Sequence, residues 1–410
     1  MSPVGSYESL MASIQAGAGS IYFGIEQLNM RARSTNNFTI NDLREISKIC
    51  TDYNVKTYLT VNAIIYDKDI SLMRKIVDAA KENNISAIIA SDISVIQYAF
   101  SIGVEVHIST QLSISNAEAL KFYAQFADVI VLARELDLKQ VKEIHRFIID
   151  NNICGPKGNL IQIEMFIHGA LCMAISGKCY LSLHEKNYSA NRGGCLQTCR
   201  KAYEVKEVES GNSLIIDNEY IMSPKDLCTI EFLDQVLDAG VSILKIEGRA
   251  RSPEYVKTVT SAYHEAVEAY LKNEFTPELG TILKQKLETV FNRGFWNGYY
   301  LGQRLGEWSR NYGSLATERK VFLGIATNYF ANAKVVEFLL QTGDLQLNDK
   351  IIITGPTTGV IEMTLNEIRV DFQNVEIAKK GEQVSILVDE RVRRNDKLFV
   401  VKKATEVDLQ

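Results

Sequence analysis

Strand-like and helix-like segments alternate along the first two-thirds of the chain. Short apolar runs are each followed by a longer segment whose apolar residues recur with helical spacing. Eight strands separated by helices is the number found in a (β/α)8 barrel, with parallel pairing expected from the crossovers. The alternative is a doubly wound open sheet, but no Gly-rich dinucleotide fingerprint follows the first strand. The sequence therefore predicts an α/β fold with a TIM-like barrel, with a strand ending at residue 5, strands at 20–24, 56–63, 87–90, 105–109, 128–132, 160–167 and 242–247, and helices that include 7–16, 40–53, 69–83, 136–149, 225–239 and 253–271.

The pattern changes after the barrel. From Lys320 onward, short β-type runs are separated by turn signals such as Gly355-Pro356. We expect residues 1–271 to form the (β/α)8 barrel with a cysteine-rich loop at 168–210, residues 272–316 to form a helical connector, and residues 317–410 to form a small all-β, barrel-type C-terminal domain.

Charge and apolar patterning narrow the class of protein. The formal net charge of −5 excludes a general basic coat for nucleic acid and leaves a local basic patch open. No apolar run is long enough to span a bilayer, and no secretory signal opens the sequence. Together with an odd number of cysteines, these features predict a cytoplasmic protein with reduced thiols and no membrane partner.

Strand periodicity directs charged side chains into the predicted barrel. In 160–167 the apolar residues alternate with Gln162, Glu164 and Phe166, so Glu164 and the following His168 are expected to face the interior or the mouth. The last strand repeats this pattern with Lys245, Glu247 and Arg249. Because burying ionised groups is unfavourable unless they are paired, we interpret these five residues as a candidate active site. The alternative is a purely structural ion-pair network.

Four of the seven cysteines fall in one polar loop. Cys172 and Cys179 form one close pair, and Cys195 and Cys199 form a second. Four thiolates suit zinc or an iron–sulfur cluster, and the spacing alone does not decide between them. A catalytic thiol would leave three cysteines unexplained. Cys50, Cys154 and Cys228 stand singly among apolar neighbours and are interpreted as core residues.

The cysteine loop also carries a resemblance. The stretch EMFIHGALCMAISGKCYLS closely resembles the signature of the collagenase-like peptidase family. GGCLQTCRKAY, IMSPKDL, LKIEGRARSPEYV, RGFWNGYYLGQ and the N-terminal SPVGSYESLMASIQAGAGSIYFGI are similar to other blocks of that family. The resemblance covers nearly the whole chain. Members of the family are similar to prephenate-dependent tRNA uridine hydroxylases. Other relatives are a ribosomal RNA cytidine hydroxylase and proteins of oxygen-independent ubiquinone hydroxylation. By its length, this chain resembles the tRNA enzymes more than the longer ribosomal RNA enzyme.

The resemblance implies a cofactor and a reaction. It implies an iron–sulfur cluster of the [4Fe-4S] type, held by Cys172, Cys179, Cys195 and Cys199. It further implies hydroxylation of the wobble uridine of tRNA at C5 to 5-hydroxyuridine without oxygen, with the anticodon loop as partner and with prephenate or another small molecule as the oxygen donor. Three alternatives stay open: a collagenase-like peptidase, a sister hydroxylase acting on ribosomal RNA or a ubiquinone precursor, and a non-catalytic RNA-binding metal protein. No HExxH motif or nucleophile elbow supports the peptidase.

An RNA substrate needs cationic contacts. Side chains expected near the barrel mouth can hold phosphates, and three arginines of the C-terminal domain can add an outer contact. The mouth group is Arg31, Arg33, Arg192, Arg200, Lys201, Arg249 and Arg251, and the outer group is Arg391, Arg393 and Arg394.

Overall fold

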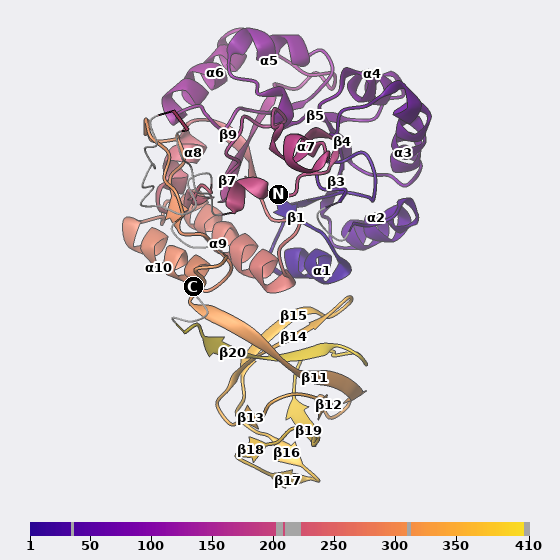
Figure 1. The fold of residues 1–410 in the computed structure, drawn as a ribbon, viewed down its shortest axis with the longest axis vertical. Coiled ribbons are helices and arrows are strands. Elements are labelled where there is room, and N and C mark those ends of the chain that lie inside the picture. Colours follow the sequence, from indigo (N-terminus) through magenta and orange to yellow (C-terminus); the bar gives the residue numbers. More distant parts are fainter. Residues whose placement is uncertain (34–36, 202–207, 210–222, 310–312, 406–410) are drawn as a thin grey trace.

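The protein consists of an α/β barrel and a separate β domain (Figure 1). The structure, a computed structural model, describes residues 1–33, 37–201, 208–209, 223–309 and 313–405. Residues 202–207 and 210 of the predicted cysteine-rich loop and residues 406–410 lie outside this set. None of the described helices combines the length and the apolar content that a membrane span needs.

A ring of parallel strands forms the barrel. The strands pair in chain order, and the final strand pairs in parallel with β7. Met1 closes the ring, because its ammonium donates to the Leu244 carbonyl at 2.7 Å and its carbonyl accepts from the Ile246 amide at 3.1 Å. The predicted barrel is confirmed. Its strands in the described chain are β1 (Ser2–Pro3), β2 (Ser20–Phe23), β3 (Lys56–Val61), β4 (Ala87–Ala90), β5 (Val106–Ile108), β6 (Val129–Val131), β7 (Gln162–Ala170) and β9 (Val241–Ile246).

Amphipathic helices cover the outside of this ring (Figure 1). In α6, the buried residues Leu138, Val141, Ile144 and Ile148 form one stripe facing the strands. Asp137 caps the helix by accepting from the Gln140 amide at 2.8 Å. The outer helices are α1 (Tyr7–Gln15), α2 (Leu43–Asp52), α3 (Ile70–Glu82), α4 (Ile93–Ser101), α5 (Ala117–Tyr123), α6 (Leu138–Asp150), α8 (Leu233–Asp238) and α9 (Pro253–Leu271).

Two short strands depart from the prediction. Residues 225–239 were expected to be one helix, but β8 (Asp226–Cys228) precedes α8 and pairs antiparallel with the end of β7. The connector contains α10 (Pro277–Glu288) and then β10 (Phe295–Trp296), which pairs in parallel with β8. This pairing brings residues near 293 to the barrel mouth. A short helix, α7 (Leu181–Lys186), lies within the cysteine loop.

The C-terminal domain is an antiparallel β structure, as predicted. Its larger sheet has the order β15-β14-β20-β11-β12-β19-β16-β17, with β13 and β18 forming a second small sheet. No pairing joins β15 to β17 among the described residues, so closure into a barrel stays a prediction. The strands are β11 (Glu318–Phe330), β12 (Val335–Leu340), β13 (Leu345–Gln346), β14 (Lys350–Gly355), β15 (Gly359–Thr364), β16 (Arg369–Val370), β17 (Gln373–Asn374), β18 (Ile377–Ala378), β19 (Gln383–Leu387) and β20 (Lys397–Lys403).

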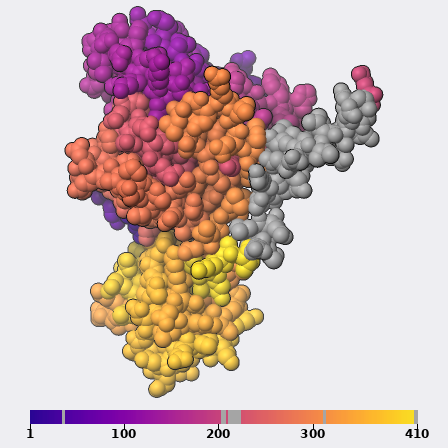
Figure 2. All heavy atoms as spheres, turned by 90° about the vertical axis from the view of Figure 1, so that its left-hand side faces the viewer, coloured from indigo at the N-terminus to yellow at the C-terminus, as the bar shows by residue number. Residues whose placement is uncertain are grey.

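Helix α1 joins the barrel to the β domain. The Gln15 side chain donates to the Thr358 carbonyl at 2.9 Å and accepts from the Val360 amide at 3.0 Å. Ala12 packs in a small buried cluster with Ile352 and Val360. Figure 2 shows the β domain, in yellow, directly beneath the barrel. The contact is on the outer side of the barrel, so the mouth is formed by the barrel and its loops.

Candidate functional site

A cavity of about 470 Å³ lies at the carboxyl ends of the barrel strands, and we call it the mouth cavity. Its walls include Tyr22 from β2, Phe166 from β7, and Glu247 and Arg249 just after β9. All four cysteines of the loop complete the wall. The carboxyl end of a (β/α)8 barrel is the end at which such enzymes keep their chemistry.

The mouth cavity is strongly cationic. Glu247 is the single acidic residue in its described lining, against six arginines and two lysines in a chain whose net charge is −5. Low-dielectric walls lined by one sign of charge attract ions of the opposite sign. The cavity is therefore suited to an anionic ligand. The cationic residues are Arg31, Arg134, Lys178, Arg200, Lys245, Arg249, Arg251 and Arg293.

Glu247 is held as a carboxylate by its neighbours. Arg31 Nη2 lies 3.1 Å from its Oε1, and the Tyr22 hydroxyl, which donates to the Ile246 carbonyl at 2.8 Å, lies 3.4 Å from its Oε2. Burial alone would raise the pKa of Glu247, but the charges of Arg31, Arg134 and Arg249 outweigh burial and lower it. The side chain is therefore ionised near neutral pH and can accept a proton from a ligand in the cavity.

Arg249 is fixed in the cavity wall close to Glu247 in the chain. Its Nη1 donates to Thr60 Oγ1 at 2.9 Å and to Asn29 Oδ1 at 3.3 Å. Burial lowers the pKa of Arg249, and Glu247 and Tyr22 act in the opposite direction. Bonds to neutral oxygens leave the guanidinium charge uncompensated by a direct carboxylate contact, so it is positioned to hold an anion.

Glu164 and Lys245 form a buried ion pair beneath the cavity. Lys245 Nζ lies 2.6 Å from Glu164 Oε1, and both side chains are almost completely buried. The other carboxylate oxygen lies 3.8 Å from His107 Nδ1. Burial would raise the pKa of Glu164, but Lys245 and His107 lower it to about 2. Both residues face the interior, and Lys245 reaches the cavity whereas Glu164 is not part of its lining.

The four loop cysteines share the mouth cavity as free thiols. Cys172 is exposed, and Cys179, Cys195 and Cys199 are half-buried. Burial raises the pKa of Cys199, Arg200 opposes this, and the thiols of Cys172, Cys195 and Cys179 raise it further. In the described part of the chain no three His, Cys, Asp or Glu side chains stand in a metal-binding arrangement. The donor set itself, four soft sulfur ligands on one loop around one cavity, fits an iron–sulfur cluster or zinc.

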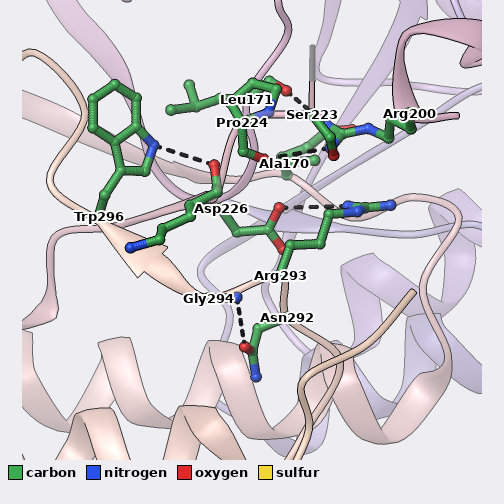
Figure 3. A network of polar contacts seen from close by, with 12 residues as sticks. Ala170, Leu171, Arg200, Ser223, Pro224, Asp226, Asn292, Arg293, Gly294 and Trp296 are labelled. Carbon is green, nitrogen blue, oxygen red and sulfur yellow. Dashed lines mark hydrogen bonds and ion pairs between the residues drawn. The ribbon is translucent and has the colours of Figure 1, made fainter. Parts of the chain in front are cut away.

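Arg200 and Arg293 are held at the cavity wall by the contacts drawn in Figure 3. Arg200 Nη2 donates to the Leu171 carbonyl at 2.7 Å, and its Nη1 donates to Ser223 Oγ at 2.9 Å. Arg293 Nη1 lies 3.4 Å from Asp226 Oδ1. Burial lowers the pKa of Arg200 to about 10, and the nearby Arg293 charge adds to this effect. Both guanidinium groups are thus fixed at the cavity.

His168 lies outside the cavity, so the prediction that it faces the interior or the mouth is wrong. A register shift between Phe166 and His168 places His168 opposite Ile246 rather than on the inner face. Its ring packs against Tyr255, Tyr263 and Phe295 at centroid distances of 6.1, 5.6 and 5.4 Å. Burial lowers its pKa to about 3, so the ring is neutral. A β-bulge reverses the side-chain alternation, and this explains the error.

The predicted RNA-binding residues are divided by the structure. Arg31, Arg200, Arg249 and Arg251 line the mouth cavity. Arg192 does not: it pairs with Asp69 at 2.8 Å and stacks on Tyr66, which ties the cysteine loop to the start of α3.

Arg33 and Lys201 are exposed and lie outside the cavity lining. The Arg33 guanidinium lies 5.2 Å from the centre of the Tyr188 ring. Lys201 Nζ lies 3.2 Å from Glu185 Oε1. In the outer group, Arg393 Nη1 donates to Thr358 Oγ1 at 3.4 Å.

Tyr22 and Arg293 are among the lining residues that the sequence did not indicate, whereas the alternation along 160–167 already placed Phe166 on the inner face. Tyr22 and Phe166 provide aromatic walls, and Lys245 Nζ lies 4.7 Å from the Tyr22 ring centre and 5.4 Å from that of Phe166. Arg293 reaches the mouth only because β10 pairs with β8. The apolar pair Phe295–Trp296 suits a strand, but it does not indicate the partner with which that strand pairs.

Comparisons with known proteins agree with this architecture. The model of peptidase family U32 matches residues 5–310. A Porphyromonas gingivalis protein named Collagenase is 61% identical over 406 residues, covering 99% of this chain and 98% of that protein. An uncharacterized protease of Methanocaldococcus jannaschii is 36% identical over 408 residues, covering 98% of each. The tRNA hydroxylation protein P1 of Bacillus subtilis is 32% identical over 367 residues, covering 87% of this chain and 83% of that protein.

These identities refine the resemblance seen in the sequence. The protein named Collagenase is nearer to this chain than tRNA hydroxylation protein P1, whereas the tRNA hydroxylases were expected to be the nearer group. The family matched covers three-quarters of the chain, including the barrel from α1 onward, the cysteine loop and the connector up to residue 310. The chain belongs to peptidase family U32.

Proposed function

We propose that this protein hydroxylates an RNA pyrimidine, the wobble uridine of tRNA, at C5 to give 5-hydroxyuridine. The observation that carries this proposal is the composition of the mouth cavity, which combines four free thiols, eight cationic side chains and one carboxylate. Two flat aromatic rings, Tyr22 and Phe166, line the same space. Aromatic stacking with cationic contacts is the usual means of holding an unstacked RNA base.

Cys172, Cys179, Cys195 and Cys199 would hold the iron–sulfur cluster. Four thiolates are the ordinary ligand set of a [4Fe-4S] cluster, and the alternative, zinc, has no redox chemistry. When bound, the cluster would supply electron transfer at the mouth. Replacing C5–H by C5–OH with oxygen from water or a hydroxyl donor releases two electrons, so the reaction also needs an external two-electron acceptor, to which a cluster would pass the electrons one at a time.

Glu247 and the arginines would act on the base and its co-substrate. The ionised Glu247 can take the proton that leaves C5, since its carboxylate faces the cavity and Arg31 fixes its orientation. Arg249, whose hydrogen bonds to described residues go to neutral oxygens, can hold an anionic group. Prephenate, the co-substrate implied by the family resemblance, carries two carboxylates and would suit a cationic cavity.

Collagen hydrolysis is the second candidate, and the 61% identity to a protein named Collagenase favours it. The geometry of the described residues gives it less support. None of the five histidines lines the mouth cavity, Glu247 is its one carboxylate, and Lys245 is paired with Glu164. A hydrolase that uses a Ser–His or Cys–His pair, or two carboxylates, needs a partner that this cavity lacks among its described residues.

The two candidates separate in one deletion strain. Total tRNA from that strain is digested to nucleosides and analysed by mass spectrometry, with and without a plasmid-borne copy of the gene. The proposal expects 5-hydroxyuridine-derived nucleosides to disappear on deletion and to return with the plasmid. Unchanged tRNA nucleosides, together with gelatin cleavage by the purified protein that depends on Glu247, would establish the peptidase instead. A change in the ribosomal RNA nucleosides or in the quinones of the deletion strain would instead indicate hydroxylation of ribosomal RNA or of a ubiquinone precursor.

A further inference from the structure

We propose that a second basic hollow, next to the mouth cavity, binds the phosphodiester backbone of the single-stranded RNA whose base enters that cavity. This inference rests on the proposed function and names the part of the substrate that the mouth cavity leaves outside. The hollow has a volume of about 520 Å³. We call it the backbone groove and define it by Arg33, Arg200, Lys201, Arg251, Phe291 and Arg293.

The charge of the backbone groove is of one sign. Five of its lining residues are arginine or lysine, and its described lining contains no aspartate or glutamate. The whole chain carries five more acidic than basic residues, so this concentration of positive charge is local. A groove of this kind tracks a phosphate backbone without reading its sequence.

Three of the arginines are held in place before any ligand binds. Arg251 Cζ lies 3.5 Å from the centre of the Phe291 ring, and Arg293 Cζ lies 4.9 Å from it. Arg200 and Arg293 are fixed by the contacts drawn in Figure 3. Burial lowers the pKa of Arg251, the charge of Asp226 opposes this, and the charge of Arg293 adds to the lowering. Asp226, which lies 3.4 Å from Arg293, offsets part of the repulsion among these like charges, and a phosphate in the groove would offset more of it.

The groove and the mouth cavity share a wall. Cys195, Gln197, Arg200, Arg251 and Arg293 line both spaces. A nucleotide whose base lies in the mouth cavity must pass its backbone over this wall, because successive phosphates flank each base. Arg33 and Lys201 line the groove and not the cavity, so they can contact only phosphates outside the reacting nucleotide.

The test removes those two outer charges. The double variant Arg33→Gln/Lys201→Gln is compared with wild type and with the control Lys142→Gln/Arg146→Gln, which alters two exposed side chains of α6. Fluorescence anisotropy of a labelled anticodon stem–loop RNA is measured over a range of salt concentrations. The groove variant should bind at least about tenfold more weakly, and the slope of log Kd against log salt should fall by about two, one for each lost phosphate contact. The control should match wild type.

The outcomes separate this inference from the proposed function. An unchanged affinity and salt slope in the groove variant, or a wild type that does not bind this RNA, would overturn the backbone groove. Equal melting temperatures and equal iron per chain establish that the groove variant is folded. If the groove variant loses affinity but the tRNA nucleosides of the deletion strain match those of wild type, the backbone groove is supported and the hydroxylase is rejected. If tRNA hydroxylation depends on the gene but the salt slope of the groove variant is unchanged, the hydroxylase is supported and the backbone groove is rejected.

Discussion

His168 and Glu247 show that a one-residue shift in strand register decides whether a side chain faces the mouth cavity. Both were predicted to lie at the mouth from strand alternation. Glu247 lines the cavity and contacts Arg31, whereas His168 packs on the outer side against α9 and β10. The strand pattern is reliable as long as the pleat continues, and the bulge after Phe166 ends it.

His168 is therefore expected to be dispensable for the reaction. His168→Phe keeps an aromatic ring among Tyr255, Tyr263 and Phe295, so hydroxylation should stay within about twofold of wild type. Glu247→Gln keeps the size of the side chain but removes its proton acceptor, so activity should fall by about a hundredfold or more. The measurement is the hydroxylated nucleoside formed per chain, at equal iron content. A loss of activity in His168→Phe with an unchanged melting temperature would contradict this assignment.

The buried Glu164–Lys245 pair makes a prediction about stability. Glu164→Gln leaves the Lys245 ammonium buried without its partner, which should reduce the free energy of unfolding by about 3–5 kcal/mol. Urea denaturation near neutral pH measures this change. Replacing both residues, as Glu164→Leu/Lys245→Met, should recover part of the loss, because no charge is then stranded. A single variant as stable as wild type would show that the pair is neither buried nor coupled.

The same pair sets a pH dependence. Folding lowers the pKa of Glu164 to about 2, from about 4.3 in an unfolded chain. Because the folded value is the lower one, its stabilising contribution is complete above about pH 4.3 and is lost as the pH falls toward about 2. Wild type should therefore lose stability steeply over this range, and Glu164→Gln should lose about 3 kcal/mol less over it. Parallel pH profiles of unfolding free energy for the two proteins would contradict the prediction.

At the level of elements, the sequence predicted the barrel well and its mouth less well. Each strand from β2 to β6, and β9, is an apolar run followed by an amphipathic helix, and such local patterns are visible in sequence. β8 was assigned to a helix because three residues, Asp226–Cys228, carry too little periodicity. Arg293 was missed because its position depends on the pairing of β10 with β8, which are separated by more than sixty residues. Non-local pairing has no local sequence signal.

The cysteine loop gives the prediction for the cofactor. Cys195→Ser should lose most of the iron from protein purified without oxygen, because a [4Fe-4S] cluster needs four thiolates. Cys50→Ser should keep its iron, since Cys50 is buried on the inner face of α2 and burial raises its pKa to about 12. Iron and sulfide per chain are measured for both, with an expected ratio of about one to one in wild type. Full iron retention in Cys195→Ser would contradict the assignment of Cys195 as a cluster ligand.

At the scale of the whole molecule, the β domain is attached through α1 and α9 rather than through the mouth. Gln15 binds the backbone of Thr358 and Val360, and Lys257 Nζ donates to the Val360 carbonyl at 2.7 Å. Deleting residues 317–410 exposes Ala12 and should lower the melting temperature of the barrel. All four cysteines lie in the remaining chain, so iron per chain should be unchanged.

The deletion should also weaken RNA binding. Arg391 and Arg394 are exposed on the β domain and can steady the body of a tRNA, so their loss should reduce affinity without reducing it to zero. The deletion should reduce the affinity for full-length tRNA more than the affinity for an isolated anticodon stem–loop. Fluorescence anisotropy measures both affinities. An equal reduction for both RNAs would place the domain's contact at the anticodon itself.

The most direct test of the whole account is the tRNA of a deletion strain carrying single cysteine variants. Mass spectrometry should find 5-hydroxyuridine-derived nucleosides with wild type and with Cys154→Ser, whose thiol lies outside the mouth cavity. The same nucleosides should be absent with Cys172→Ser at an equal level of protein. Full modification by Cys172→Ser, or tRNA that is the same with and without the gene, would contradict the claim that this cysteine-lined cavity hydroxylates tRNA.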